Sequence, residues 1–159
     1  MTANPLREVS VETEIAVAAD VLYDMVADLP RMGEWSPECE RVEWSGGATA
    51  AARGVQFVGH NRNGSRQWST HGTVTVAERG QQFTFEVRSI FNLPVSLWSY
   101  RFSPAPSGTR VVETTEDRRG WLIRTAGRLA TGISDRTARN RETMTVTLQR
   151  LKEAAEAGR

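Results

Sequence analysis

Apolar residues recur at helical spacing along residues 136–155, near the end of the chain. Met144, Leu148, Leu151 and Ala155 follow one another at intervals of four, three and four residues, so they share one face of an α-helix. The opposite face carries mainly charged and amide side chains. An isolated helix of this length is marginal in water, so its apolar face must pack against another element. We therefore expect a long amphipathic C-terminal helix that packs against the rest of the chain.

Earlier in the chain, alternation of apolar and polar residues over 9–15 predicts a first strand. Residues 18–29 then repeat at helical spacing, and Pro30 ends this helix because the residue before a proline disfavours helical geometry. A second short helix is expected over 31–35. A further strand is predicted over 40–44, and it leads into a loop of small residues. The chain therefore opens with a strand and two short helices.

Two turn signals divide the middle of the chain into antiparallel strands. The dipeptide Asn63-Gly64 predicts a two-residue type I′ turn, which needs positive φ at both central positions. A second turn is expected at Arg79-Gly80. Together the two turns give one continuous apolar face without a change of register, which favours an antiparallel meander. The expected pairs are Gly59 with Trp68, Phe57 with Thr70, Val76 with Phe83, Val74 with Phe85 and Gly72 with Val87.

The last predicted hairpin leaves the orientation of Glu113 open. Aromatic side chains alternate along residues 98–102, and residues 109–117 form the next strand. A four-residue loop at 105–108 pairs Tyr100 with Glu113 and places this carboxylate on the apolar face. A loop that is one residue longer or shorter turns the residues on either side of Glu113 toward that face instead. Both alternatives are compatible with the sequence.

The order of these elements predicts an α+β fold. A seven-stranded, strongly curved antiparallel sheet is expected to wrap around the long C-terminal helix, with two short helices after the first strand. Residues 118–135 predict an irregular helix, which is either a lid or an ordinary packed helix. Residues 1–159 are expected to form a single domain. The inward side chains are few, large and interrupted by Gly59 and Gly72, so we expect an internal cavity.

Composition and charge exclude several classes of function. The formal net charge of +1 gives no overall field for nucleic acid, so no nucleic-acid partner is expected. Cys39 is the only cysteine, which rules out an internal disulfide and a paired-cysteine metal site. No segment has the length or hydropathy of a signal peptide or a membrane span, so a cytoplasmic location is expected. A monomer and a homodimer are both compatible with the sequence.

Four segments give the chain a resemblance to a known superfamily. They are DLPRMGEWSPECE at 28–40, FVGHNRNGSRQW at 57–68, WSYRF at 98–102 and TLQRLKEAAE at 147–156. With the order of elements, they resemble the START-related helix-grip superfamily (SRPBCC), specifically its polyketide cyclase/dehydrase and lipid-transport branch. The resemblance implies a ligand cavity between the long helix and the sheet, with its mouth near the first short helices. It implies no particular catalytic residues, because the branch shares none.

The predicted cavity combines apolar and polar side chains. Glu113 and Tyr100 are the catalytic candidates. Burial would raise the pKa of the Glu113 carboxyl, which could then act as a general acid or base beside the Tyr100 hydroxyl. The alternative is that Glu113 faces solvent or pairs with Arg101. His60 and His71 fall on the outer face, which disfavours a catalytic or metal role. The predicted cavity residues are Trp35, Phe57, Asn61, Trp68, Thr70, Phe83, Phe85, Trp98, Tyr100, Glu113, Met144 and Leu148.

Three functions are compatible with these patterns. The first is binding of a hydrophobic small molecule, such as a lipid, a polyketide or an aromatic compound, in the cavity. The second is a cofactor-independent cyclase or dehydratase that uses the same cavity. The third is an interaction protein whose Arg-rich last third meets an acidic partner or RNA. No sequence motif calls for a metal or a cofactor.

Overall fold

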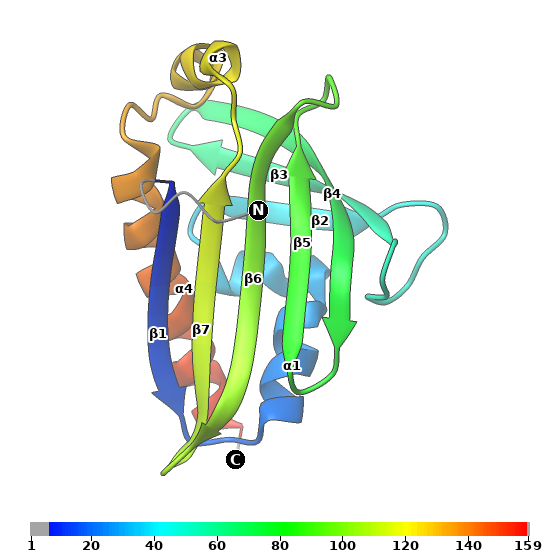
Figure 1. Ribbon diagram of the computed structural model, residues 1–159, viewed down its shortest axis with the longest axis vertical. Coiled ribbons are helices and arrows are strands. Elements are labelled where there is room, and N and C mark those ends of the chain that lie inside the picture. Colours follow the sequence, from blue (N-terminus) through cyan, green and yellow to red (C-terminus); the bar gives the residue numbers. More distant parts are fainter. Residues whose placement is uncertain (1–6, 159) are drawn as a thin grey trace.

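The computed structural model describes residues 7–158 (Figure 1). Residues 1–6 lie outside the described range, and so does this part of the N-terminal segment that was expected to lack a signal peptide. The strands are β1 (Glu8–Ile15), β2 (Cys39–Trp44), β3 (Gln56–Asn63), β4 (Arg66–Glu78), β5 (Gln82–Arg88), β6 (Pro94–Ala105) and β7 (Gly108–Asp117). The helices are α1 (Ala19–Ala27), the 3-10 helix η1 (Leu29–Arg31), α2 (Met32–Trp35), α3 (Trp121–Thr131) and α4 (Arg136–Ala157).

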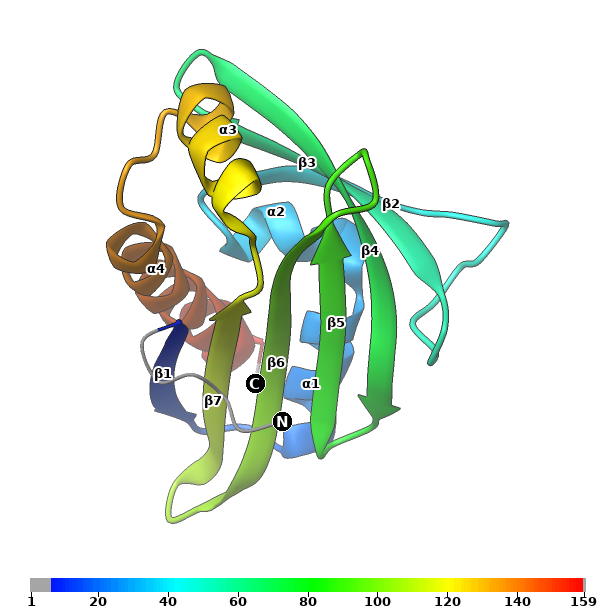
Figure 2. The same cartoon turned by 45° about the horizontal axis from the view of Figure 1, so that its top comes forward.

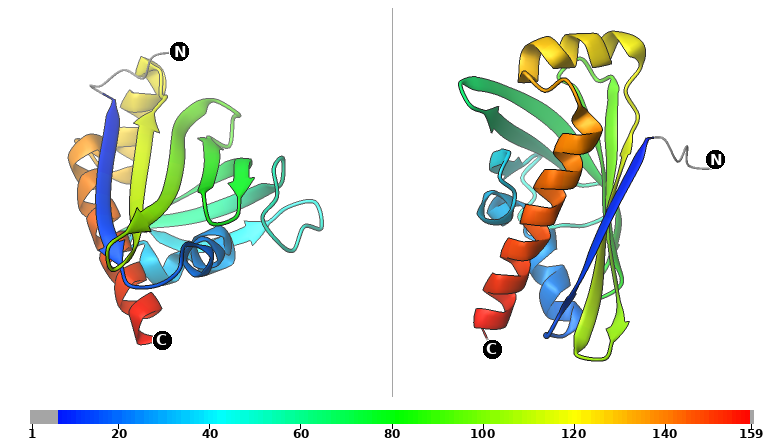
Figure 3. Two further views of the ribbon diagram at one scale, coloured as in Figure 1. Left: turned by 60° about the horizontal axis from the view of Figure 1, so that its bottom comes forward. Right: turned by 90° about the vertical axis from the view of Figure 1, so that its left-hand side faces the viewer.

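All seven strands form one antiparallel sheet in the order β1-β7-β6-β5-β4-β3-β2. Figures 2 and 3 show the sheet curving around α4, while α1 and α2 lie on the same side of the sheet as that helix. Figure 1 shows α3 at one end of the sheet, far from α1. The predicted α+β helix-grip fold is confirmed. Among residues 7–158, no helix is long and apolar enough to cross a membrane.

Helix α4 begins at a side-chain cap and buries the predicted apolar face. The Asp135 carboxylate accepts a hydrogen bond of 3.0 Å from the amide of Ala138, which satisfies one of the free N–H groups at the helix start. The four apolar residues of the predicted face are all buried. Buried Asn140, Thr143 and Thr147 extend that face toward the N-terminal half of the helix. The inner face of α4 is therefore apolar near its end and polar near its start.

The tightest core lies at the α1 end of the sheet. Tyr23 of α1 meets Phe83 edge-on, with ring centroids 6.0 Å apart, and Phe102 at 6.2 Å. Such edge contacts add to the burial of the rings themselves. Leu22 and Leu29 are fully buried beside them in the same cluster. Side chains fill this end of the sheet, and the remaining internal space lies toward α3.

The β3–β4 hairpin turns one residue later than predicted. Gly64 and Ser65 are its central residues, with Gly64 at φ 60°, so the turn has the glycine-first pattern of type II′. The expected pairs of Gly59 with Trp68 and Phe57 with Thr70 were therefore wrong by two residues. The observed pairs are Asn61 with Trp68, Gly59 with Thr70 and Phe57 with Gly72. A shift by two preserves the faces, so the predicted inner face is unchanged.

The β4–β5 pairing was predicted correctly up to a bulge. Val74 pairs with Phe85 and Gly72 with Val87, as expected. A register shift between Val74 and Val76 then places Val76 opposite Thr84, so the expected pair with Phe83 was wrong. A bulge of this kind adds one residue to a strand and increases its local twist. It lies in the half of the hairpin that approaches α1.

The β6–β7 hairpin settles the orientation of Glu113. Pro106 and Ser107 form a two-residue turn, because Ala105 pairs with Gly108. Tyr100 then lies opposite Glu113, and the Glu113 side chain is buried on the inner face with only 2% of its surface exposed. The alternatives in which Glu113 faces solvent or pairs with Arg101 are excluded, since Arg101 is exposed. One of the two registers compatible with the sequence is thus realised.

Gly72 provides a test of this packing. A Cβ at Gly72 would lie 2.0 Å from Cζ of Phe57, whose ring is fixed by edge contacts with Trp44 and Phe85. We predict that Gly72→Ala lowers the free energy of unfolding by about 1–3 kcal/mol in urea titrations, because the ring must move. Gly120→Ala is the control, since a Cβ there meets no atom within 4 Å. Equal stability of Gly72→Ala and wild type would contradict the close approach.

Candidate functional site

A cavity of about 540 Å³ lies between the concave face of the sheet, α4 and α3. Its size falls in the range of small-molecule sites. Nine of the twelve predicted cavity residues line it: Phe57, Asn61, Trp68, Thr70, Phe85, Trp98, Tyr100, Glu113 and Met144. Leu29, Met32 and Ser36 also line it, so the cavity reaches the first short helices, where the resemblance placed the mouth. The roles of these side chains in binding remain predictions.

Three predicted cavity residues belong instead to the packed core. Trp35, Phe83 and Leu148 are buried among other apolar side chains and do not line the cavity. Phe83 lies against Tyr23 of α1, in the part of the sheet that side chains fill. Leu148 lies one turn beyond Met144, where α4 enters the core. The sequence pattern identified their inner face correctly but could not tell which end of it would be filled.

Glu113 and Tyr100 form the most unusual polar pair in the cavity wall. The Tyr100 hydroxyl donates a hydrogen bond of 2.9 Å to Oε1 of Glu113, and both side chains are almost completely buried. Oε2 of Glu113 is also buried and has no hydrogen-bond partner among the described residues. A buried polar atom without a partner costs free energy, so such an atom beside a cavity calls for an explanation.

Burial sets the charge state of this pair. It raises the pKa of Glu113 to about 8, against a smaller opposing effect of the hydrogen bond from Tyr100. Burial and the neighbouring Glu113 also hold the pKa of Tyr100 well above its ordinary value. At neutral pH the Glu113 carboxyl is therefore mainly protonated. With Oε1 accepting from Tyr100, the proton on Oε2 is available to a group inside the cavity.

Helix α4 contributes a row of polar groups that sequence reasoning missed. Asn140, Thr143 and Thr147 all line the cavity and are buried. Thr143 donates its hydroxyl to the carbonyl of Asn140 at 3.1 Å, and Thr147 donates to the carbonyl of Thr143 at 2.8 Å. Their hydroxyl oxygens can still accept a hydrogen bond from a ligand. The spacing of three and four residues, beside the predicted apolar face, was the signal that could have found them.

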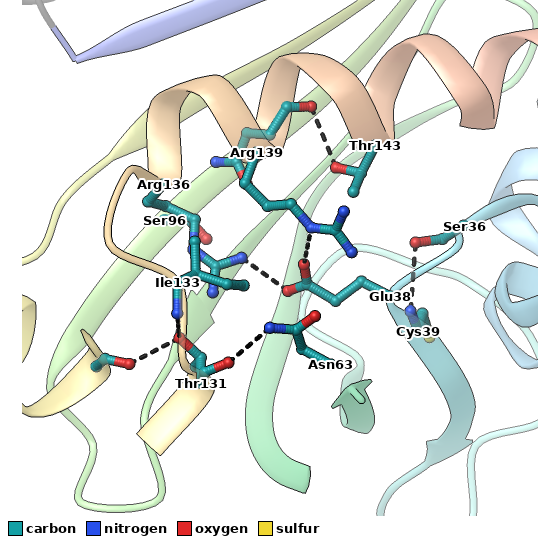
Figure 4. A network of polar contacts seen from close by, with 12 residues as sticks. Ser36, Glu38, Cys39, Asn63, Ser96, Thr131, Ile133, Arg136, Arg139 and Thr143 are labelled. Carbon is teal, nitrogen blue, oxygen red and sulfur yellow. Dashed lines mark hydrogen bonds and ion pairs between the residues drawn. The ribbon is translucent and has the colours of Figure 1, made fainter. Parts of the chain in front are cut away.

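An ion-pair network joins α4 to β2 at the edge of the cavity. Figure 4 shows Glu38, just before β2, directed toward Arg136 and Arg139 at the start of α4. Arg136 donates to Oε1 of Glu38 at 2.7 Å, and Nε of Arg139 lies 3.6 Å from Oε2. The Arg136 guanidinium also lies over the Trp68 ring, 5.8 Å from its centroid. Glu38 and Arg136 are mostly buried, so this network fixes the distance between the two elements.

Helix α3 covers the cavity and is fastened near both ends. At the β7 side, Nε of Arg124 in α3 lies 3.9 Å from the Asp117 carboxylate, which also accepts two hydrogen bonds of 2.9 Å from Arg119. Burial opposes ionisation of Asp117, but these bonds hold the pKa of its carboxyl below the ordinary value. At the other end, Asn63 donates to the carbonyl of Thr131 at 2.9 Å (Figure 4). Arg66 donates to the carbonyl of Leu129.

The inner side of α3 identifies the helix as the lid of the cavity. Ile123, Ala126 and Ala130 line the space below it. The helix ends at Gly132, which adopts the left-handed conformation with φ 71°. Of the two alternatives for residues 118–135, the structure favours a lid over an ordinary packed helix.

Other reactive side chains are less suited to chemistry here. His60 accepts or donates a hydrogen bond with Ser69 at 2.9 Å, and neither His60 nor His71 lines the cavity. Cys39 lines the cavity, but burial raises the pKa of its thiol to about 11, so the reactive thiolate is scarce at neutral pH. Within residues 7–158, no group of three or more His, Cys, Asp or Glu is placed to hold a metal ion.

The chain and its fold have counterparts among known proteins. The family model described as polyketide cyclase / dehydrase and lipid transport matches residues 7–156, so the chain belongs to that family. No functionally curated protein matches the chain in sequence.

Solved structures show the same fold. The Polyketide_cyc-like protein Cgl2372 from Corynebacterium glutamicum is 25% identical, with a TM-score of 0.62 and coverage of 95% of this chain and 92% of that chain. The di-domain ARO/CYC StfQ from the steffimycin biosynthetic pathway is 15% identical, with a TM-score of 0.70 and coverage of 94% and 50%. CV1439 from Chromobacterium violaceum is 10% identical, with a TM-score of 0.69 and coverage of 94% and 98%.

The protonation of Glu113 predicts a pH dependence of stability. Its pKa is 4.5 ordinarily and about 8 when buried, so the folded state holds this proton more tightly than the unfolded chain. That stabilising contribution is complete below about pH 4.5 and is lost as the pH rises to about 8. Relative to Glu113→Gln, wild type should lose stability on the order of 1 kcal/mol per pH unit across this window. If the free energy of unfolding, measured in urea, changed with pH equally in the two proteins, Glu113 would be ionised in the folded state.

Proposed function

We propose that the protein binds a hydrophobic small molecule in its cavity, with a hydrogen-bond acceptor of the ligand placed against Glu113. The observation that carries this proposal is the buried Oε2 of Glu113, which has no hydrogen-bond partner within residues 7–158 and lies beside an open space of about 540 Å³. A ligand carbonyl would accept the proton of this neutral carboxyl and remove the cost of an unsatisfied group. Membership of a family described by polyketide cyclisation and lipid transport supports the same conclusion.

The rest of the lining favours a flat, largely apolar ligand. The rings of Phe57 and Phe85 meet edge-on at 5.4 Å and offer their surfaces to the cavity together with Trp98. The Trp98 ring nitrogen already donates a hydrogen bond of 2.9 Å to Ser96, so it needs no hydrogen-bond acceptor from the ligand. Polar groups line the cavity on β3 and β4, at Asn61 and Thr70, as well as on β7 and α4. An aromatic compound or a folded polyketide with polar groups on more than one side fits this distribution.

The same pair of side chains supports a second candidate function, an intramolecular aldol cyclisation. Glu113 would give its proton to a ligand carbonyl oxygen while an enol carbon of the same chain attacks the carbonyl carbon. The enol hydroxyl would return its proton to the Glu113 carboxylate, so that no cofactor is consumed. The Tyr100 hydrogen bond stabilises the carboxylate between these steps. A pKa near 8 is well matched to such proton transfer at neutral pH.

The third function, an interaction of the Arg-rich last third with an acidic protein or RNA, has less support. Arg136 and Arg139 are paired with Glu38, and Arg119 with Asp117, so much of this charge is neutralised within the molecule. A cytoplasmic location, a monomeric or homodimeric state and a single domain over residues 1–159 remain predictions from the sequence.

Matched probes test the binding proposal. Anthraquinone carries two carbonyls, whereas anthracene has the same ring system without them. We predict that wild type binds anthraquinone more tightly than anthracene in thermal-shift and fluorescence titrations. Glu113→Leu should weaken anthraquinone binding about tenfold, because a hydrogen bond from a buried group is lost. Glu113→Gln should keep the preference, since its amide still donates.

Glu116→Gln is the control for this test, because it removes a glutamate of the same strand that pairs with Arg118 outside the cavity. Failure of wild type to bind either probe would contradict an open apolar cavity. If Glu113→Leu bound anthraquinone as tightly as wild type does, the cavity would still be a binding site, but Glu113 would not be the group that binds the ligand carbonyl.

Glu113→Gln also separates binding from catalysis. Glutamine can donate a hydrogen bond but cannot transfer a proton at neutral pH. For a cyclase, turnover of a poly-β-keto substrate should fall by about 10²-fold or more in Glu113→Gln, with substrate affinity nearly unchanged. Equal turnover by the variant and wild type would exclude Glu113 as the proton donor.

A further inference from the structure

A patch of exposed apolar side chains lies on α3 and on the β5–β6 loop, two segments that also line the cavity. We call it the mouth patch, and its residues are Ile90, Phe91 and Leu93 of the β5–β6 loop with Trp121, Leu122 and Leu129 of α3. Each of these residues is between 44% and 78% exposed. Within residues 7–158 only one other large apolar side chain, Val21 of α1, is equally exposed. Exposed apolar side chains that cluster in this way mark a binding surface more often than scattered ones do.

The two halves of the mouth patch border the same cavity. Ile90 and Phe91 line the cavity from the loop, and Ile123 and Ala126 line it from α3. The amide of Arg118, just before α3, donates to the carbonyl of Val95 beside the loop at 2.9 Å. Figures 1 and 2 show the loop between β5 and β6 at the same end of the molecule as α3, away from α1. One flat partner could therefore touch both halves at once.

Helix α3 adds positive charge to the mouth patch, because it carries Arg124 and Arg128 but no acidic residue. Arg124 lies 3.9 Å from the Asp117 carboxylate, whereas Arg128 forms no ion pair with another residue of 7–158. These two arginines lie three and seven residues after Trp121, so they flank the outward face of the helix on one side. A helix with tryptophan and leucine on one face and arginine beside them is typical of segments that lie in the interface of an anionic membrane.

We propose that α3 and the β5–β6 loop dock on the surface of an anionic lipid bilayer. The apolar side chains would enter the interface, and the arginines would meet lipid phosphates. A second copy of the chain fits less well, because a two-fold contact through α3 brings the arginines of both copies together. The docking itself needs no cavity ligand. The role of the docking rests on the proposed function: an apolar ligand would pass between the cavity and the bilayer without crossing water.

Vesicle co-sedimentation tests this docking with the full chain and no added ligand. We expect wild type to bind vesicles of phosphatidylcholine and phosphatidylglycerol, to bind pure phosphatidylcholine vesicles weakly, and to lose binding as salt is added. The double variant Trp121→Ser/Leu122→Ser should bind at least about tenfold more weakly, because it removes two apolar side chains from the interface. Arg128→Gln should weaken binding on the order of fivefold.

Val21→Ser is the matched control, since it removes an exposed apolar side chain from α1 and should leave vesicle binding unchanged. None of the substituted side chains lines the cavity, so melting temperature and anthraquinone binding should stay at the wild-type values. Failure of docking and failure of ligand binding are thereby distinguished.

Three results would overturn the proposal. One is a wild type that stays in solution with anionic vesicles. Another is equal vesicle binding by wild type and Trp121→Ser/Leu122→Ser. The third is that wild type forms a dimer or an RNA complex but does not bind vesicles, and that the double variant fails to form this complex. That result would assign the mouth patch to a macromolecular partner.

Discussion

The packing of α4 across a sheet that curves away from it determines both the core and the cavity. Leu148, Leu151 and Ala155 belong to the same apolar core as the side chains of α1, with α4 packed mainly on β1 and α1 packed on β5 and β6. One turn earlier, Met144 lines open space instead, in company with Thr143. A rigid helix cannot follow the curvature of a twisted sheet, so close packing at one end separates the two at the other. The fold obtains its stability and its binding space from different halves of the same helix.

Glu113 shows the cost of this arrangement. A carboxyl placed on the inner face of β7 loses its hydration, and a single hydrogen bond from Tyr100 does not replace it. Protonation is the least costly response, and the raised pKa reflects it. A leucine at this position would pack without such a penalty. A buried acid that destabilises the fold is easier to understand as part of a site than as part of a core.

The sequence predicted the order of elements and the inner face of the sheet because both follow from the spacing of apolar residues. Around Gly64 the faces were correct although the pairing was not, since the turn moved the register by an even number of residues. Val76 was assigned to the wrong face, because the bulge places it opposite Thr84 and puts Ala77 opposite Phe83. The bulge near Val76 and the filling of the space around Phe83 depend on the twist of the whole sheet, which no local pattern records. Asn140 and Thr143 were missed because polar residues on the inner face of a helix contradict the rule that identified the helix. The orientation of Glu113 depended on a single residue in one loop.

The hydrogen bonds that Asn63 and Arg66 donate to carbonyls at the end of α3 have a consequence for dynamics. The last carbonyls of a helix have no partners within it, and here a hairpin from another part of the chain supplies them. Lid and hairpin tip are therefore parts of one cooperative unit, although more than fifty residues separate them along the chain. Their amides should exchange with solvent at a common rate, set by opening of the unit as a whole. The same opening would then limit how fast any occupant of the cavity can leave.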